Sequence, residues 1–95
     1  MKRYIRSATH ENSPKKYIYD ICEYLGWNVP AFTDPAAGGY RLRYRESSEE
    51  DAQQTVEEIK KAAADLNISI VKALVKPANH GYWYAYVVVP RYDAE

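Results

Sequence analysis

A Gly-Tyr hairpin motif occurs twice in this chain, and this repetition most restricts the folds that it can adopt. The stretch from Asp34 to Tyr44 reads DPAAGGYRLRY, and the stretch from Lys76 to Tyr86 reads KPANHGYWYAY. In both, Pro-Ala is followed by two variable residues, then by Gly-Tyr, and then by a second Tyr four residues on. Turn residues followed by alternating aromatic residues indicate a strand after each turn. The sequence therefore predicts two β-hairpins.

A helical pattern precedes each hairpin. Ser13-Pro14 should begin the first helix and Ser47 or Ser48 the second, because Ser is a good N-cap and Pro suits the first turn. Gly26 fits the C-cap of the first helix. The apolar residues that recur at helical spacing are Ile18, Ile21, Cys22 and Leu25, and then Ala52, Val56, Ile59, Ala63 and Leu66. Strands are expected at residues 2–7, 27–33, 40–45, 68–76 and 82–89.

These elements predict an α+β fold of order βαββαββ, with a mainly antiparallel sheet and both helices on one face. We interpret this as a ferredoxin-like plait or a close variant, in one domain spanning residues 1–95. An internal helix-hairpin duplication would place one copy at about 13–46 and the other at about 48–90. Gly39 and Gly81 would then have equivalent positions with positive φ. Chance similarity of two turns is the alternative.

The face of the sheet away from the helices, here called the open face, is where we expect function. Arg41, Arg43 and Arg45 alternate with Tyr40, Leu42 and Tyr44, which predicts a half-buried strand with the arginines on the open face. A faithful repeat would turn Tyr82, Tyr84 and Tyr86 toward the helices and Trp83 toward the arginines. The opposite orientation would expose the tyrosines. The candidate binding residues are Arg41, Arg43, Arg45, Asn79, His80, Tyr82, Trp83 and Tyr84. The alternative is a solvated arginine face paired with acids of the second helix.

Catalytic and metal chemistry find no support in the residue pattern. Cys22 lies on an apolar helical stripe, whereas His10 and His80 are in loops, so no Cys/His nucleophile pair or zinc ligand set is expected. Thirteen Lys and Arg balance thirteen Asp and Glu, which argues against a general polyanion binder but allows a local patch. We expect a cytoplasmic protein, because neither a signal peptide nor a membrane span is evident. No cofactor is expected.

The stretch HGYWYAY partly resembles the aromatic strand of RNA-recognition motifs. Gly81, Tyr82 and Tyr84 match that pattern, but His80 stands for its basic residue and Trp83 for its small residue. In that family the strand precedes the second helix, whereas here it follows the second helix. The resemblance covers about seven residues, and it implies a sheet on which aromatic side chains stack with bases.

The opening MKRYIRSAT resembles small bacteriophage and mobile-element proteins of Firmicutes over about nine residues. This resemblance implies only a phage or mobile-element setting, in which small proteins often act by binding. We therefore expect a non-enzymatic protein that binds a host protein and inhibits a host defence factor, such as a CRISPR nuclease, by direct contact. A second hypothesis is a module that sequesters a nucleotide signal or binds single-stranded nucleic acid through the Arg/aromatic face. A third is a structural domain that forms a homodimer.

Overall fold

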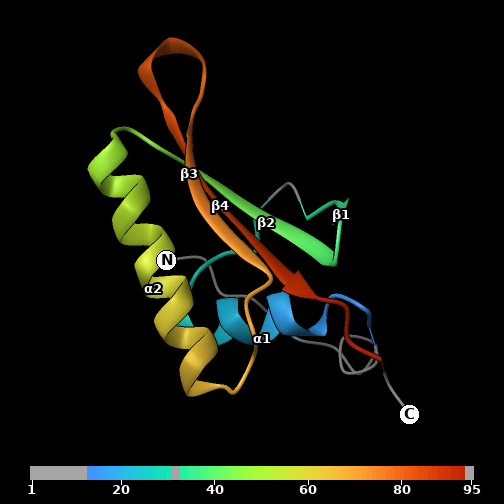
Figure 1. The fold of residues 1–95 in the computed structure, drawn as a ribbon. Helices are drawn as coiled ribbons and strands as arrows, with labels where there is room; N and C mark the ends of the chain where they lie inside the picture. Colours follow the sequence, from blue (N-terminus) through green and yellow to red (C-terminus); the bar gives the residue numbers. More distant parts are fainter. Residues whose placement is uncertain (1–12, 31–32, 94–95) are drawn as a thin grey trace.

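The computed structural model describes residues 13–30 and 33–93 and has an α+β architecture (Figure 1). Two helices and a four-stranded sheet follow one another along these residues, with a short 3₁₀ turn in the last hairpin. Their bounds are α1 Lys16–Leu25, β1 Pro35–Ala36, β2 Gly39–Glu46, α2 Glu49–Asp65, β3 Lys72–Pro77, η2 Asn79–Gly81 and β4 Trp83–Pro90. The prediction of an α+β fold with two helices and an antiparallel sheet is confirmed, and the arrangement is consistent with a ferredoxin-like fold.

The strand order in the sheet is β1-β2-β4-β3, and every neighbouring pair is antiparallel. The strand expected at residues 2–7 lies outside the described residues. The strand expected at 27–33 is wrong in position, because residues 27–30 belong to no strand and β1 begins at Pro35. The Trp27 ring packs edge-on against Tyr44 at 5.4 Å, and the Tyr44 hydroxyl donates to the Asn28 carbonyl. These contacts hold the segment against the core without backbone pairing to a neighbouring strand.

Local sequence determines most helix ends. Gly26 has a left-handed conformation at the end of α1, as predicted, with φ of 74°. Ser48 caps α2 by accepting a hydrogen bond from the Asp51 amide at 3.0 Å. The start of α1 differs from the prediction, since the helix begins at Lys16 and the Ser13 hydroxyl accepts from the Lys15 amide at 3.1 Å in the preceding turn.

Both helices share one core with one face of the sheet. Ile18, Ile21 and Cys22 of α1 pack with residues of α2 and with the inward side chains of β2 and β4. The other buried members of this cluster are Leu42, Ala52, Val56, Ile59, Ala62, Ala63, Ile68, Ala85, Val87 and Val89. The helical stripes predicted from spacing are thus the surfaces that α1 and α2 bury.

The last strand has the opposite orientation to the one that a faithful repeat predicts. In β4, Ala85, Val87 and Val89 are fully buried against the helices, so Tyr84 and Tyr86 lie on the open face. The reason is the hairpin register: Pro35 pairs with Tyr40, whereas Pro77 pairs with Trp83, one residue later in the motif. A shift of one residue moves every side chain of a strand to the other face.

The two motif glycines also differ in their surroundings. Gly39 and Gly81 both have positive φ, as predicted, at 157° and 80°. Gly39 opens β2 directly opposite Pro90, whereas Gly81 lies in η2 beside His80, which itself has φ of 62°. The full βαββαββ order and the internal duplication stay predictions.

Candidate functional site

Three arginine-tyrosine pairs line the open face along β2 and β4. The Arg43 guanidinium lies 4.3 Å from the Tyr84 ring centroid, and the Arg45 guanidinium lies 4.6 Å from the Tyr82 centroid. Arg41 lies over Tyr86 at 5.6 Å. Each guanidinium therefore meets a tyrosine of β4, or Tyr82 immediately before β4, within the range of a cation–π interaction. We call these three pairs the Arg-Tyr ladder.

The alternation of β2 and the register of β4 produce this ladder together. Arg43 is directly opposite Tyr86 and Arg45 is directly opposite Tyr84, so each arginine reaches diagonally to a tyrosine two residues earlier in the chain: Tyr84 in β4, and Tyr82 immediately before it. Long side chains commonly reach such diagonal neighbours in an antiparallel pair. Because residues repeat every two positions along a strand, successive pairs are spaced by about 6.6–7 Å.

Two lysines of β3 extend the positive charge beyond the ladder. Lys72 and Lys76 pair with Val88 and Tyr84 and share their face, and both side chains are exposed. The Lys76 ammonium lies 5.1 Å from the Tyr86 ring centroid. Sequence reasoning missed both lysines as site residues. The two-residue spacing around Leu74 would have placed them on one face, but only the sheet order shows that β3 is next to β4.

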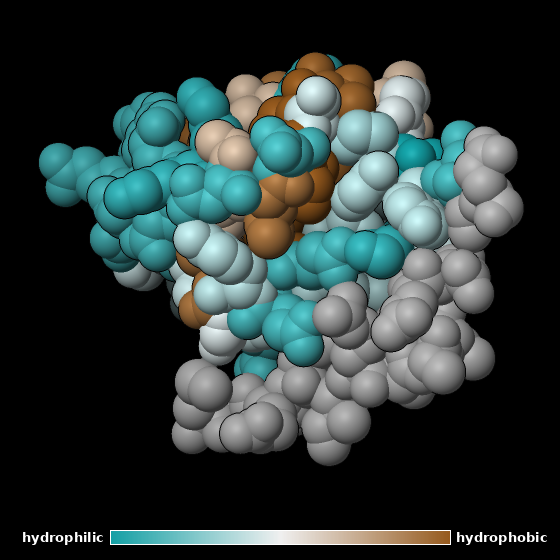
Figure 2. All heavy atoms as spheres, turned by 90° about the horizontal axis from the view of Figure 1, so that it is seen from below, coloured by the Kyte–Doolittle hydropathy of each residue, from teal (hydrophilic) through white to brown (hydrophobic). Residues whose placement is uncertain are grey.

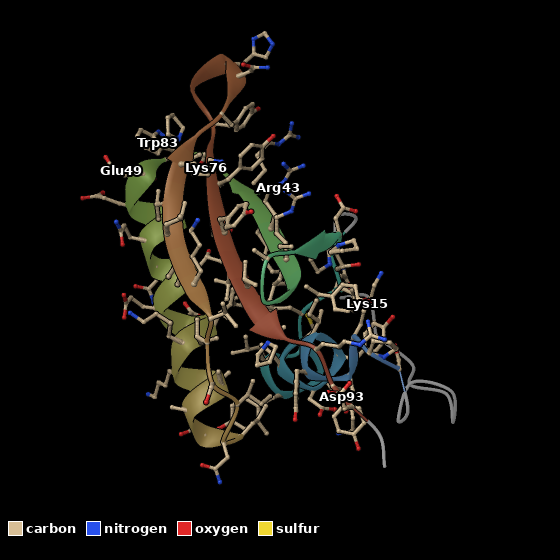
Figure 3. The ribbon with its side chains drawn as sticks, turned by 45° about the vertical axis from the view of Figure 1, so that its right-hand side comes forward. Lys15, Arg43, Glu49, Lys76, Trp83 and Asp93 are labelled. Carbon is tan, nitrogen blue, oxygen red and sulfur yellow. The ribbon has the colours of Figure 1, made fainter. Side chains whose placement is uncertain are left out.

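Acidic side chains concentrate on α2, on the other side of the sheet. This helix carries Glu49, Glu50, Asp51, Glu57, Glu58 and Asp65. Figure 3 shows Glu49 on α2, whereas Arg43 points away from that helix. This separation does not favour the alternative in which acids of α2 pair with the arginines. At one end of the ladder, the Arg41 guanidinium forms an ion pair with Asp34, which precedes β1. The arginines of β2 and the acids of α2 thus lie on opposite sides of the sheet.

The structure brings together most of the candidate binding residues but separates Trp83 from them. Tyr82 is 38% exposed and takes part in the ladder. Asn79 and His80 are exposed in η2, in the connection that immediately precedes Tyr82. Trp83 is partly buried and packs against the core, and Figure 3 shows it on the side of α2. Tyr86 takes its place on the open face.

Cys22 lies in the core, away from the ladder. Its side chain is 1% exposed, and its sulfur lies 3.3 Å from the Tyr44 hydroxyl. Burial raises the pKa of the Cys22 thiol to about 11, although the hydrogen bond with Tyr44 opposes this shift. Burial, followed by the neighbouring Cys22, also raises the pKa of Tyr44. A thiol with a raised pKa is a poor nucleophile, which fits a packing role.

Apart from the ladder, the described residues show a hydrophobic surface patch, but no group of metal ligands and no membrane-spanning helix. Seen from below, hydrophobic residues reach the surface in one central patch between hydrophilic side chains (Figure 2). Within residues 13–30 and 33–93, no three His, Cys, Asp or Glu side chains are grouped so that they could hold a metal ion. No helix in this part of the chain has the length and apolar character needed to cross a membrane.

Comparison of the chain with protein-family models, with curated proteins and with solved structures found no match. The arrangement of the open face itself is therefore the basis for inferring a function. Tyr84, and Tyr82 immediately before β4, lie on the side of the sheet away from the helices.

Proposed function

We propose that this protein is a non-enzymatic module that binds single-stranded nucleic acid across the open face. The observation that carries the proposal is the Arg-Tyr ladder, which combines planar cations with aromatic rings on one sheet surface. Single strands are held by positive charge along the phosphates and by stacking of bases on aromatic rings or guanidinium planes. The ladder presents both kinds of group.

The stacking also prepares the arginines for binding. A guanidinium that rests on a tyrosine keeps fewer conformations, so less entropy is lost when its outer plane meets a base or its edge meets a phosphate. Arg43 and Arg45 lie closest to their rings, at 4.3 Å and 4.6 Å. Spacing of the pairs along the strand is of the same order as the spacing of nucleotides in an extended strand. A bound strand would accordingly run along β2 and β4.

Charge separation reconciles this function with a net charge of zero. The ladder and the two lysines of β3 make the open face basic, while the acids of α2 lie beyond the sheet. Local positive potential steers an anionic strand toward this face, and the acidic side disfavours other orientations. We therefore expect binding that weakens strongly as the salt concentration rises and that takes place along β2 and β4.

Fluorescence anisotropy with a short fluorescein-labelled oligothymidylate tests the proposal. The variant Arg45→Gln/Lys76→Gln removes two charges from the open face, and Lys60→Gln/Lys61→Gln removes two charges from α2. We expect the first variant to lose about tenfold or more in affinity and its salt slope to shrink by about 1.4, twice the value of about 0.7 per phosphate. The second should bind like the wild type. Equal losses in both variants, or no binding by the wild type, would refute the proposal.

Contact with an acidic surface of a host protein is a second candidate function. Tyr and Arg dominate the binding energy of protein interfaces, and both are concentrated on the open face. In this form the protein would be a cytoplasmic, phage-type inhibitor of a host defence factor such as a CRISPR nuclease. Capture of a host nuclease by the wild type and by Lys60→Gln/Lys61→Gln, but not by Arg45→Gln/Lys76→Gln, would support this candidate.

A further inference from the structure

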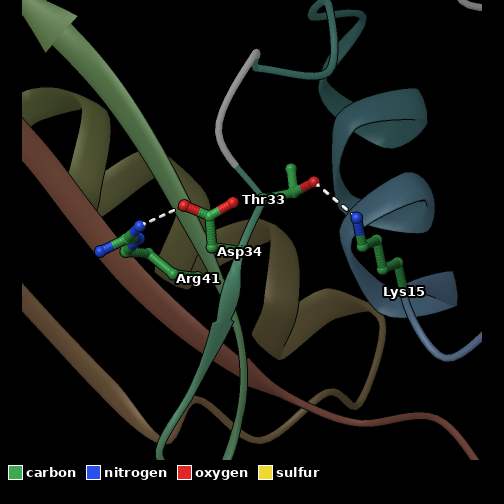
Figure 4. Close-up of polar contacts among 4 residues, drawn as sticks. All are labelled: Lys15, Thr33, Asp34 and Arg41. Carbon is green, nitrogen blue, oxygen red and sulfur yellow. Dashed lines mark hydrogen bonds and ion pairs between the residues drawn. The ribbon is translucent and has the colours of Figure 1, made fainter.

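Asp34 occupies one end of the Arg-Tyr ladder. Its carboxylate accepts a hydrogen bond from the Arg41 side chain at 2.5 Å, and its backbone carbonyl accepts from the Arg41 amide at 2.8 Å (Figure 4). The adjacent Thr33 accepts a hydrogen bond from the Lys15 ammonium at 3.0 Å. These contacts fix the segment before β1 between α1 and β2, so the Asp34 carboxylate has a defined position.

The Arg41 end of the ladder differs from the Arg45 end. Arg41 is only 24% exposed, and Val88, directly opposite, is only 2% exposed. Hydrogen bonds with Tyr86 and then with Asp34 raise the pKa of the Arg41 guanidinium, which keeps it charged. Its Nε atom is buried and has no hydrogen-bond partner. Arg45 is exposed and, among the described residues, contacts no carboxylate within ion-pair distance.

We infer that Asp34 is a specificity-determining residue of the proposed nucleic-acid face, because its carboxylate takes the position at Arg41 that a phosphate would use. Carboxylates and phosphates compete for the same charge-assisted hydrogen bonds of a guanidinium. The negative charge of Asp34 also repels a phosphate that approaches this end. The bound strand therefore engages Arg43 and Arg45 and ends before Arg41. This inference rests on the proposed function.

The substitution Asp34→Asn tests the role of this carboxylate. Asn has nearly the same shape and can still accept a hydrogen bond from Arg41, but it carries no charge. We expect the variant to bind the oligothymidylate several-fold more tightly, with a salt slope larger by about 0.7, the value for one additional phosphate on a single strand. Glu57→Gln is the matched control, since it removes the same charge from α2, where Glu57 pairs with Lys60 at 3.6 Å. Unchanged or weaker binding by Asp34→Asn would overturn the inference.

A titration with pyrophosphate, followed by ¹H-¹⁵N NMR, separates this inference from the proposed function. In the wild type, the terminal guanidinium (Nη–H) signals of Arg45 should shift while those of Arg41, which contact Asp34, stay in place; in Asp34→Asn both should shift. A wild-type Arg41 signal that shifts as much as Arg45 would show that Asp34 does not exclude phosphate. If neither protein binds the oligothymidylate, the proposed function fails, and the pyrophosphate shifts still decide the role of Asp34.

Discussion

Replacing Gly39 with alanine should force β2 and β4 apart where their pairing begins. A Cβ atom at this position would overlap the carbonyl oxygen of Val89 and would lie 2.9 Å from the Cα atom of Pro90. Both obstacles are backbone atoms of a central strand, so no side-chain rotation can relieve the overlap. Gly39 pairs with Pro90 and Tyr40 pairs with Val89, so any movement that relieves the overlap disturbs the backbone pairing of β2 with β4.

The expected loss follows from two terms. Overpacking of a well-packed site costs about 1–3 kcal/mol, and each backbone hydrogen bond weakened at this end contributes about 1 kcal/mol. We therefore expect Gly39→Ala to lower the free energy of unfolding by about 3 kcal/mol. With a urea m-value of about 2 kcal/mol/M for a small domain, the midpoint should fall by about 1.5 M.

Gly81→Ala is the matched control. No atom lies within 4 Å of the Cβ position at Gly81, so only the left-handed conformation, with φ of 80°, is penalised. That strain is about 1–2 kcal/mol, and reduced freedom of the unfolded chain offsets about 0.4–1 kcal/mol of it. Urea unfolding followed by the fluorescence of Trp27 and Trp83 measures both variants. Equal midpoints for the two variants, or a wild-type midpoint for Gly39→Ala, would show that the close approach of β2 and β4 is not as described.

Two further predictions concern the core. The Cys22 thiol, with its pKa raised from 9.0 to about 11, should react slowly with a thiol reagent at pH 8. Because this thiol ionises first in the unfolded chain, its ionisation should lower the free energy of unfolding of the protein by up to about 3 kcal/mol as the pH rises from 9 to 11. A fast native-state reaction, or the same alkaline loss in Cys22→Ala, would contradict this assignment. Trp83→Ala should lower the free energy of unfolding by about 3 kcal/mol, the low end for loss of a tryptophan because Trp83 is only partly buried. It should leave the affinity of the folded protein for oligothymidylate unchanged, since Trp83 packs on the helix side; reduced affinity in a fully folded variant would place it in the site.

Local sequence patterns determined the elements that depend on local physics. The Gly26 C-cap, the Ser48 N-cap and the alternation of Arg41, Arg43 and Arg45 along β2 all follow from interactions within a few residues. The same holds for the helical stripes that became the core. These features placed the three arginines on the face away from the helices, and therefore half of the candidate site.

Only the tertiary structure decided which tyrosines and which acid meet these arginines. The two hairpin motifs look alike in sequence, yet Pro77 pairs with Trp83 where the first motif pairs Pro35 with Tyr40. A difference of one residue in hairpin register has no local signature, because the buried surface of the opposite strand selects between the two faces. Burial of Val87 and its apolar neighbours in β4 selected the face that exposes Tyr84. Asp34 reached Arg41 because β1 pairs with β2, a contact that charge patterning along the chain does not encode.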